Sequence, residues 1–314
     1  MKKSLFTFVV ALFIATMSVS AHETITASKN YVTKTVNTGS FTSIYVTSSI
    51  DVEFRQGPLK VQLYVADNLA KYVEVKVSNN ALTAYYNFSG SITINGSNNT
   101  KLIVSAPNVD TFLTQSSGDI TIKSGYVVTG KVSFITQASG DIKALSVKAD
   151  EVALTTQGSG DIEMSTVDAT KAFIITQASG DIDVVSVKAP TVSLMSQASG
   201  DIEVKSVNGT SATVLTQGSG DVDVAQLSVT TLDAGAHASG DMTLKGSCVN
   251  ATYNTYGSGN VYARGMKAEA VNATTYGSGD IDCYATKSIQ GSEMGSGDVS
   301  VGGNPRQNKL KKRD

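Results

Sequence analysis

A short motif that recurs about every twenty residues restricts the fold of this chain more than any other feature. A Ser-Gly-Asp or Ser-Gly-Asn unit followed by an apolar residue occurs ten times, with its third residue at Asp119, Asp141, Asp161, Asp181, Asp201, Asp221, Asp241, Asn260, Asp280 and Asp298. Successive copies are 18 to 22 residues apart. Such regularity is typical of a chain that stacks one small structural unit along a single axis.

Each copy contains two short blocks in which apolar and polar residues alternate. In one copy, Ile182 and Val184 belong to the first block, and Val192 and Leu194 to the second. Alternation with a period of two predicts strands that bury one face. A unit this small cannot bury its apolar side chains alone, so successive copies should stack at the strand spacing of about 4.8 Å. The sequence therefore predicts an all-β solenoid of about ten coils.

Three columns of stacked side chains are expected to form the core. They run from Ile120 to Val299 directly after each Asp, from Ile122 to Val301 two residues later, and from Phe112 to Ala273 in the second strand. The glycine before each Asp suits a corner with positive φ, which only glycine adopts readily.

The rest of the chain divides into three further segments. Residues 1–21 combine Lys2 and Lys3 with an apolar run and a small-residue end, which predicts a signal peptide removed before His22. Residues 22–115 are expected to form an N-terminal strand-rich cap, with a hairpin turn at 78–81 and a degenerate first coil at 89–92 and 101–104. The repeats occupy 116–301, and a basic tail follows at 302–314. We expect an exported protein that is periplasmic, outer-surface or secreted in a Gram-negative bacterium, without a transmembrane segment after signal removal.

The chain resembles the head GIN domain family of autotransporter adhesin heads, found in secreted proteins of Bacteroidetes-type bacteria. The resemblance rests on residues 41–44, on Ile50-Asp51-Val52-Glu53-Phe54-Arg55-Gln56-Gly57, and on the Gly-Ser-Gly-Asp corners at 158–161, 218–221 and 277–280. It implies a right-handed single-stranded β-helix with an N-terminal strand-rich part, located in the envelope or secreted. The family offers no catalytic residues to carry over.

Acidic residues are expected to line one edge of the solenoid, with one or two on each coil. Calcium prefers several closely placed oxygens, which makes weak candidate ligands of Asp161, Glu163, Asp181, Asp183, Asp201, Glu203, Asp221 and Asp223. The favoured interpretation is structural: each Asp of the repeat accepts hydrogen bonds from the backbone of its own turn, as an Asn at position 260 also could. No cofactor is therefore expected.

A second outward column consists of glutamines and ends in aromatic residues. Gln115, Gln137, Gln157, Gln177, Gln197 and Gln217 should hydrogen-bond along the axis as a ladder. His237, Tyr256 and Tyr276 continue this column and are the best aromatic candidates for contact with a sugar.

An apolar stripe should lie on the same outward face, at Leu113, Ile135, Ile175, Met195 and Leu215. Exposed stripes of this extent usually mark a contact surface. We expect either the N-terminal segment or a second subunit, and hence a homo-oligomer, to cover it.

The remaining residue types argue against several functions. The net charge of −2 and the lack of a basic patch outside the tail give no nucleic-acid footprint. The two histidines, His22 and His237, lie at the processing junction and in the glutamine column, where neither can complete a catalytic triad. Cys248 and Cys283 should lie two coils apart, too far for a disulfide, with Cys283 in the core.

The sequence thus predicts a non-catalytic adhesin-like module that contacts a cell-surface protein or a glycan. The alternatives are a polysaccharide-active β-helix enzyme, whose chemistry would need paired carboxylates, and a calcium-stabilised scaffold.

Overall fold

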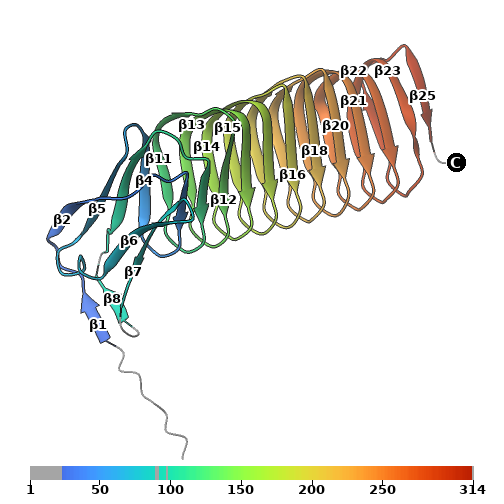
Figure 1. Cartoon of the computed structure of the whole chain (residues 1–314). Helices are drawn as coiled ribbons and strands as arrows, with labels where there is room; N and C mark the ends of the chain where they lie inside the picture. The colour runs from blue at the N-terminus through green and yellow to red at the C-terminus, as the bar shows by residue number, and fades with distance from the viewer. Residues whose placement is uncertain (1–22, 89–91, 97, 313–314) are drawn as a thin grey trace, which may run out of the picture.

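The computed structural model describes residues 23–88, 92–96 and 98–312. They form a straight rod of stacked parallel coils with an irregular N-terminal end (Figure 1). The described residues contain no helix, and hence none that could span a membrane. The expected signal peptide lies outside these residues.

The rod confirms the predicted all-β solenoid of about ten coils. The repeats comprise β10 (Thr111–Thr114), β11 (Ile120–Val127), β12 (Lys131–Thr136), β13 (Ile142–Thr156), β14 (Ile162–Thr176), β15 (Ile182–Lys188), β16 (Thr191–Ser196), β17 (Ile202–Asn208), β18 (Ser211–Thr216), β19 (Val222–Ser228), β20 (Thr231–Ala236), β21 (Met242–Thr255), β22 (Val261–Thr275), β23 (Ile281–Glu293), β24 (Val299–Gly302) and β25 (Gln307–Lys311). Each strand pairs in parallel with its counterpart in the next coil. Ile142 is therefore in register with Ile162, and Ile162 with Ile182.

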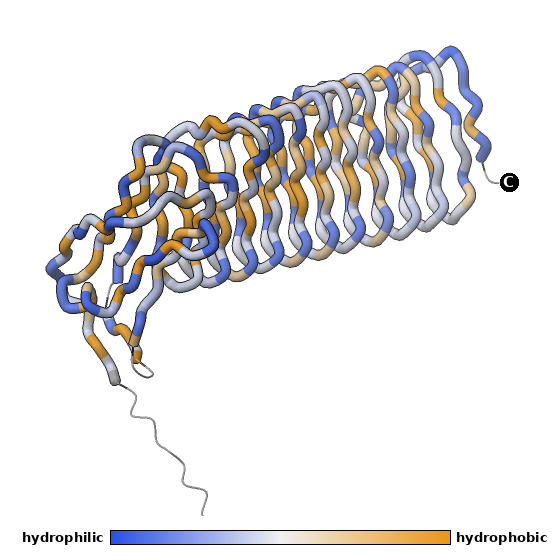
Figure 2. The backbone as a smooth tube through the Cα atoms, viewed as in Figure 1, coloured by the Kyte–Doolittle hydropathy of each residue, from blue (hydrophilic) through white to orange (hydrophobic). Residues whose placement is uncertain are grey.

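The core is built from the three predicted columns. All their members are buried except Val301, which is half-buried in the last coil. Hydrophobic segments accordingly recur at the same level of successive coils (Figure 2). A fourth column, unforeseen from the sequence, is polar: buried hydroxyls of Thr114, Thr136, Thr156, Thr176, Thr216, Thr255 and Thr275 each donate a hydrogen bond to a glycine carbonyl in the next coil. These bonds satisfy the corner carbonyls inside the rod.

The predicted reason for the corner glycines is wrong. None of the glycines of the Ser-Gly-Asp corners has φ in the left-handed region. Each is required by close packing instead: a Cβ added to Gly180 would lie 2.2 Å from the carbonyl oxygen of Gly160 in the preceding coil, and one added to Gly200 would lie 2.2 Å from that of Gly180. Glycine is needed because backbone stacks directly on backbone at this corner.

Most strands of the N-terminal region join the same sheet through a different topology. The strands of this region are β1 (Glu23–Thr26), β2 (Tyr31–Val36), β3 (Ser43–Val46), β4 (Asp51–Gln56), β5 (Lys60–Ala66), β6 (Val73–Ser78), β7 (Ala81–Tyr86), β8 (Ile92–Asn95) and β9 (Lys101–Ala106). Of these, β1 and β8 form a sheet of their own. The β6–β7 hairpin turns at Asn79 and Asn80, both with positive φ, which confirms the predicted turn.

The coil next to the repeats differs from the expected one. β3 and β4 stack in parallel on β10 and β11, while β7 and β9 lie on the far side of β3 and β4. The segment predicted as a degenerate first coil is therefore divided: β9 lies next to β4 in the N-terminal region, and β8 pairs with β1 in a separate two-stranded sheet. β5 pairs antiparallel with β9, and β2 pairs antiparallel with β5.

Aromatic rings fill the junction between the N-terminal region and the coils. Phe54 meets Phe112 and Tyr126 edge-on, with ring centroids 5.0 and 5.4 Å apart, and Phe112 stacks on Phe134 at 5.1 Å. All four are fully buried. At the other end of the rod, β25 pairs with β23, and its lysines are exposed.

Candidate contact surfaces

The Asp column forms a continuous hydrogen-bonded ladder. The backbone N–H of each member donates to the side-chain oxygen of its counterpart in the preceding coil, at 2.7 to 3.0 Å, from Asp51 and Asp119 at one end to Asp280 and Asp298 at the other. The expectation that each carboxylate caps its own turn is therefore wrong, because the acceptor serves the next coil. Asn260 keeps the ladder intact, since its amide oxygen accepts from Asp280.

A second set of acids lies two residues further along on four consecutive coils. Glu163, Asp183, Glu203 and Asp223 are exposed and stack in register. Partial burial raises the pKa of Asp183, and the charges of Glu203 and Asp181 raise it further. No group of three potential metal-ligating side chains among the described residues is arranged to hold an ion. The eight candidate calcium ligands are therefore brought to one face without forming a preassembled site.

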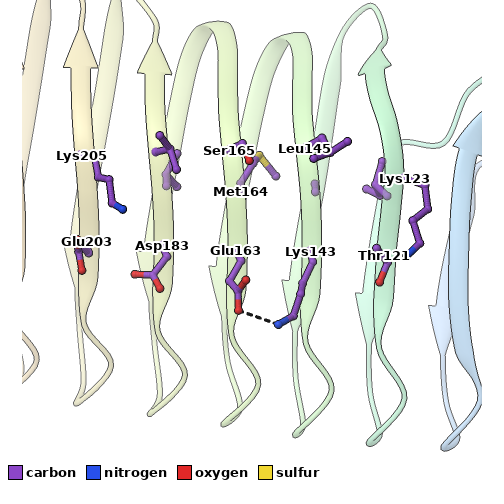
Figure 3. A pocket seen from close by; sticks show the side chains of 14 residues that line it. Thr121, Lys123, Lys143, Leu145, Glu163, Met164, Ser165, Asp183, Glu203 and Lys205 are labelled. Atoms are coloured by element: carbon purple, nitrogen blue, oxygen red, sulfur yellow. Dashed lines mark hydrogen bonds and ion pairs between the residues drawn. The ribbon is translucent and has the colours of Figure 1, made fainter.

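A groove of about 500 Å³ runs beside these outward acids, across five coils from Thr121 to Lys205 (Figure 3). Glu163, Asp183 and Glu203 lie on the neighbouring strands β14, β15 and β17, and Lys143 bonds to Glu163 at 2.8 Å. Leu145 and Val185 line the groove with side chains that are 56% and 49% exposed. We did not anticipate this groove from the sequence. The available signal was an apolar residue directly after an inward one, as in Ala144-Leu145 and Val184-Val185, which breaks the strict alternation.

The glutamine ladder is confirmed. Each amide donates to the next from Gln115 to Gln197 at 2.9 to 3.0 Å, and the last step to Gln217 is 3.4 Å. Beyond it, His237 meets Tyr256 edge-on, and Tyr256 stacks on Tyr276 with ring centroids 4.7 Å apart. The facing surfaces of these two tyrosines cover each other, so a sugar could reach only their edges or outer faces. Glycan contact at these three residues stays a prediction.

The apolar stripe is neither bare nor part of the core. Ile135, Ile175, Met195 and Leu215 are half-buried, shielded by their neighbours along the axis, whereas Leu113 is buried. Leu113 is the member that an N-terminal strand reaches, through the pairing of β3 with β10. Within the described ranges, N-terminal strands pair with β10 and β11 alone among the coils. The N-terminal segment thus covers the stripe only at its end, and cover by a second subunit stays a prediction.

The two cysteines are free, as predicted, and Cys283 lies in the core, also as predicted; Cys248 is buried as well, which the sequence did not predict. Cys248 lies in β21 and Cys283 in β23. Burial raises the pKa of the Cys248 thiol to about 11 and that of the Cys283 thiol to about 12. Both side chains therefore act as small apolar groups and not as nucleophiles at neutral pH.

The sequence of the chain matches a known protein family over most of its length. The family described as "Putative auto-transporter adhesin, head GIN domain" matches residues 40–219 and again residues 185–305. The chain belongs to this head GIN domain family. The two matches overlap within the regular coils, as expected where successive coils are nearly interchangeable. No curated protein matches the chain.

Three solved structures match the chain over most of its length. A putative adhesin from Bacteroides fragilis is 20% identical, with 92% of this chain and 96% of that chain covered and a TM-score of 0.32. A putative adhesin from Parabacteroides merdae is 13% identical, with 93% and 100% covered and a TM-score of 0.42. A putative lipid binding protein from Parabacteroides distasonis is 17% identical, with 92% and 97% covered and a TM-score of 0.36.

Proposed function

We propose that this protein is a non-catalytic contact module of the bacterial cell envelope, exported by its N-terminal segment and used for adhesion to a cell-surface protein or a glycan. The family description as an adhesin head supports this proposal. So does the signal-like composition of residues 1–21.

One observation carries the proposal: the outward side chains repeat from coil to coil. The acid ladder, the glutamine ladder and the outward acids each present the same group at the same level over several coils. A rigid, repetitive surface suits multivalent contact, in which many equal and weak interactions add up. Catalysis would instead require unlike groups gathered at one place.

The test is binding of the purified full chain to intact bacterial cells and to arrays of cell-surface glycans and proteins. We expect retention on at least one of these surfaces, and no release of reducing ends from any polysaccharide. The heat-unfolded chain is the control. Polysaccharide cleavage would establish the enzyme alternative, and retention no better than that of the unfolded chain would contradict an adhesive role.

A calcium-stabilised scaffold is a separate alternative with its own measurement. Calcium that binds only the folded state must raise the melting temperature, and a chelator must reverse the shift. We expect no shift at millimolar calcium, because the aspartates of the ladder already accept backbone hydrogen bonds. A reversible upward shift would support the scaffold instead.

A further inference from the structure

The groove beside the outward acids combines two kinds of wall. On one side, Glu163, Asp183 and Glu203 present carboxylates at intervals of one coil, about 4.8 Å. On the other side, Leu145 and Val185 expose aliphatic side chains to solvent, with Ser165 between them and Lys205 on the coil beyond Val185. Met164 and Val184 are buried beneath and give the groove an apolar floor. Such a surface can bury the aliphatic groups of a linear partner.

Three acids and three lysines line the groove, but the lysines lie toward its ends: Lys123 and Lys143 on the two coils nearest the cap, and Lys205 beside Glu203 on the last coil. Lys143 pairs with Glu163, and Lys123 at the cap end lies 3.9 Å from Glu53. Asp183 and Glu203 form none of the ion pairs found within the described ranges. The adjacent Asp ladder adds further negative charge, and the pKa of Asp183 is accordingly raised, first by partial burial and then by Glu203 and Asp181. The middle of the groove is therefore the place where a cation from a partner would gain most.

We propose that this groove binds an extended polypeptide segment of a partner, in which basic side chains alternate with aliphatic ones. The basic side chains pair with Asp183 and Glu203, while the aliphatic ones cover Leu145 and Val185. The proposal rests on the contact function proposed above and names its site and its partner class.

A polypeptide fits the groove better than a glycan for a chemical reason. The residues that line it, all within the described part of the chain, include no aromatic ring on which a sugar could stack. An extended chain offers alternate side chains to opposite sides, which suits a groove with acids on one side and Leu145 and Val185 on the other; the long lysine side chain can span the difference between the chain's interval of about 6.7 Å and the coil spacing of about 4.8 Å. A neutral glycan could donate hydroxyl hydrogen bonds to the carboxylates, but it offers no positive charge and would find no ring to stack on.

The experiment titrates the full chain with a peptide of about eight residues that alternates lysine and leucine, an order of size set by the extended rise per residue. Two control peptides test the two sides of the groove separately. One alternates lysine with serine and lacks the aliphatic groups, and the other alternates glutamate with leucine and lacks the positive charges. We expect only the lysine–leucine peptide to bind tightly, with an affinity that falls as salt increases. Chitosan oligomers serve as the cationic glycan.

Two pairs of matched variants locate the binding. Asp183→Asn with Glu203→Gln should weaken the peptide about tenfold, while Asp233→Asn with Glu269→Gln, which removes the same charge elsewhere, should not. Leu145→Ser with Val185→Ser should weaken it several-fold, whereas Val127→Ser with Val249→Ser should have no effect. All these side chains lie at the surface, so thermal melting should show that the variants fold.

Three outcomes would overturn the proposal: no binding by the unmodified chain, equal loss in the matched controls, or chitosan binding as tightly as the peptide and losing affinity with the same groove variants. Adhesion of each variant to intact cells separates this proposal from the general one. If the Asp183→Asn/Glu203→Gln variant adheres as well as the unmodified chain, the groove assignment fails while the contact function stands. If the unmodified chain does not adhere, the contact function fails.

Discussion

The regular coils and the N-terminal region bury their apolar side chains and pair their backbone groups in different ways. In the coils, identical neighbours stack on one another, and hydrogen-bonded ladders of Asp, Gln and Thr run along the axis. In the N-terminal region no two strands repeat. Antiparallel strands and a cluster of aromatic rings around Phe54 cover the end of the stack. A repeat can stabilise its neighbours, but the first one needs a partner of another kind, because an open end would expose apolar columns and unpaired backbone groups.

The largest effect should come from the aromatic junction between the two regions. Phe54→Ala removes a fully buried ring that touches Phe112 and Tyr126, and large-to-small changes of this kind cost about 3–5 kcal/mol. Urea unfolding measures the loss. Phe88→Ala, in the same region but only half-buried, is the control and should cost less. Equal losses would mean that the junction has no special role.

Next in size is the effect of a methyl group at a coil corner. Gly200→Ala places a Cβ 2.2 Å from the carbonyl oxygen of Gly180, so the coils must separate locally, at a cost of about 3 kcal/mol, near the upper end for overpacking. Gly39→Ala, in the N-terminal region with nothing within 4 Å of the new Cβ, should leave the free energy of unfolding nearly unchanged. A tolerated Gly200→Ala would contradict the close-packing explanation of the repeat.

The contribution of the buried threonine hydroxyls to stability can be tested with two neighbouring residues, Thr156 and Thr155. Thr156→Val removes the hydroxyl that donates to the Gly180 carbonyl at 2.8 Å and should cost about 1–2 kcal/mol, since a buried acceptor loses its partner. Thr155→Val, on the outward face between Ile135 and Ile175, extends the apolar stripe and should be neutral. Chemical denaturation measures the loss of stability in each variant. If Thr155→Val lost more stability than Thr156→Val, the buried threonine hydroxyls would not stabilise the stack.

The smallest effect concerns the outward acids and depends on pH. The pKa of Asp183 is raised above its ordinary value of 3.8 by partial burial and then by the neighbouring acids. The folded chain therefore holds this proton more tightly than the unfolded chain, and stability falls as the pH rises from 3.8 through the folded-state pKa.

Asp183→Asn removes this penalty. The variant should be more stable than the unmodified chain at neutral pH, by less than about 1 kcal/mol because the group is largely exposed. The two should converge at acidic pH, where the carboxyl is protonated in both states. Urea midpoints measured over a pH series would show this convergence, and a constant difference at all pH values would contradict it.

Much of the fold could be predicted from the sequence because a solenoid repeats one local pattern. The inward columns, the glutamine ladder and the two free cysteines all follow from counting residues between copies, and the structure bears them out. The contact surfaces were harder to predict. The groove depends on how far Leu145 and Val185 project beside the acids. The alternation of apolar and polar residues predicts which face of a strand a side chain lies on, but it does not predict the shape of that surface.

Alternation and spacing are local properties, so the period of about twenty residues and the inward side chains could be read directly from the chain. The neighbours of each coil and the hydrogen-bond partner of each polar group depend on packing in three dimensions. β3 and β4 precede the repeats in space although about fifty residues separate β4 from β10. The Asp carboxylates bond the following coil, and the corner glycines are required by the backbone above them. These facts depend on contacts between residues at least eighteen positions apart, which spacing along the chain does not specify.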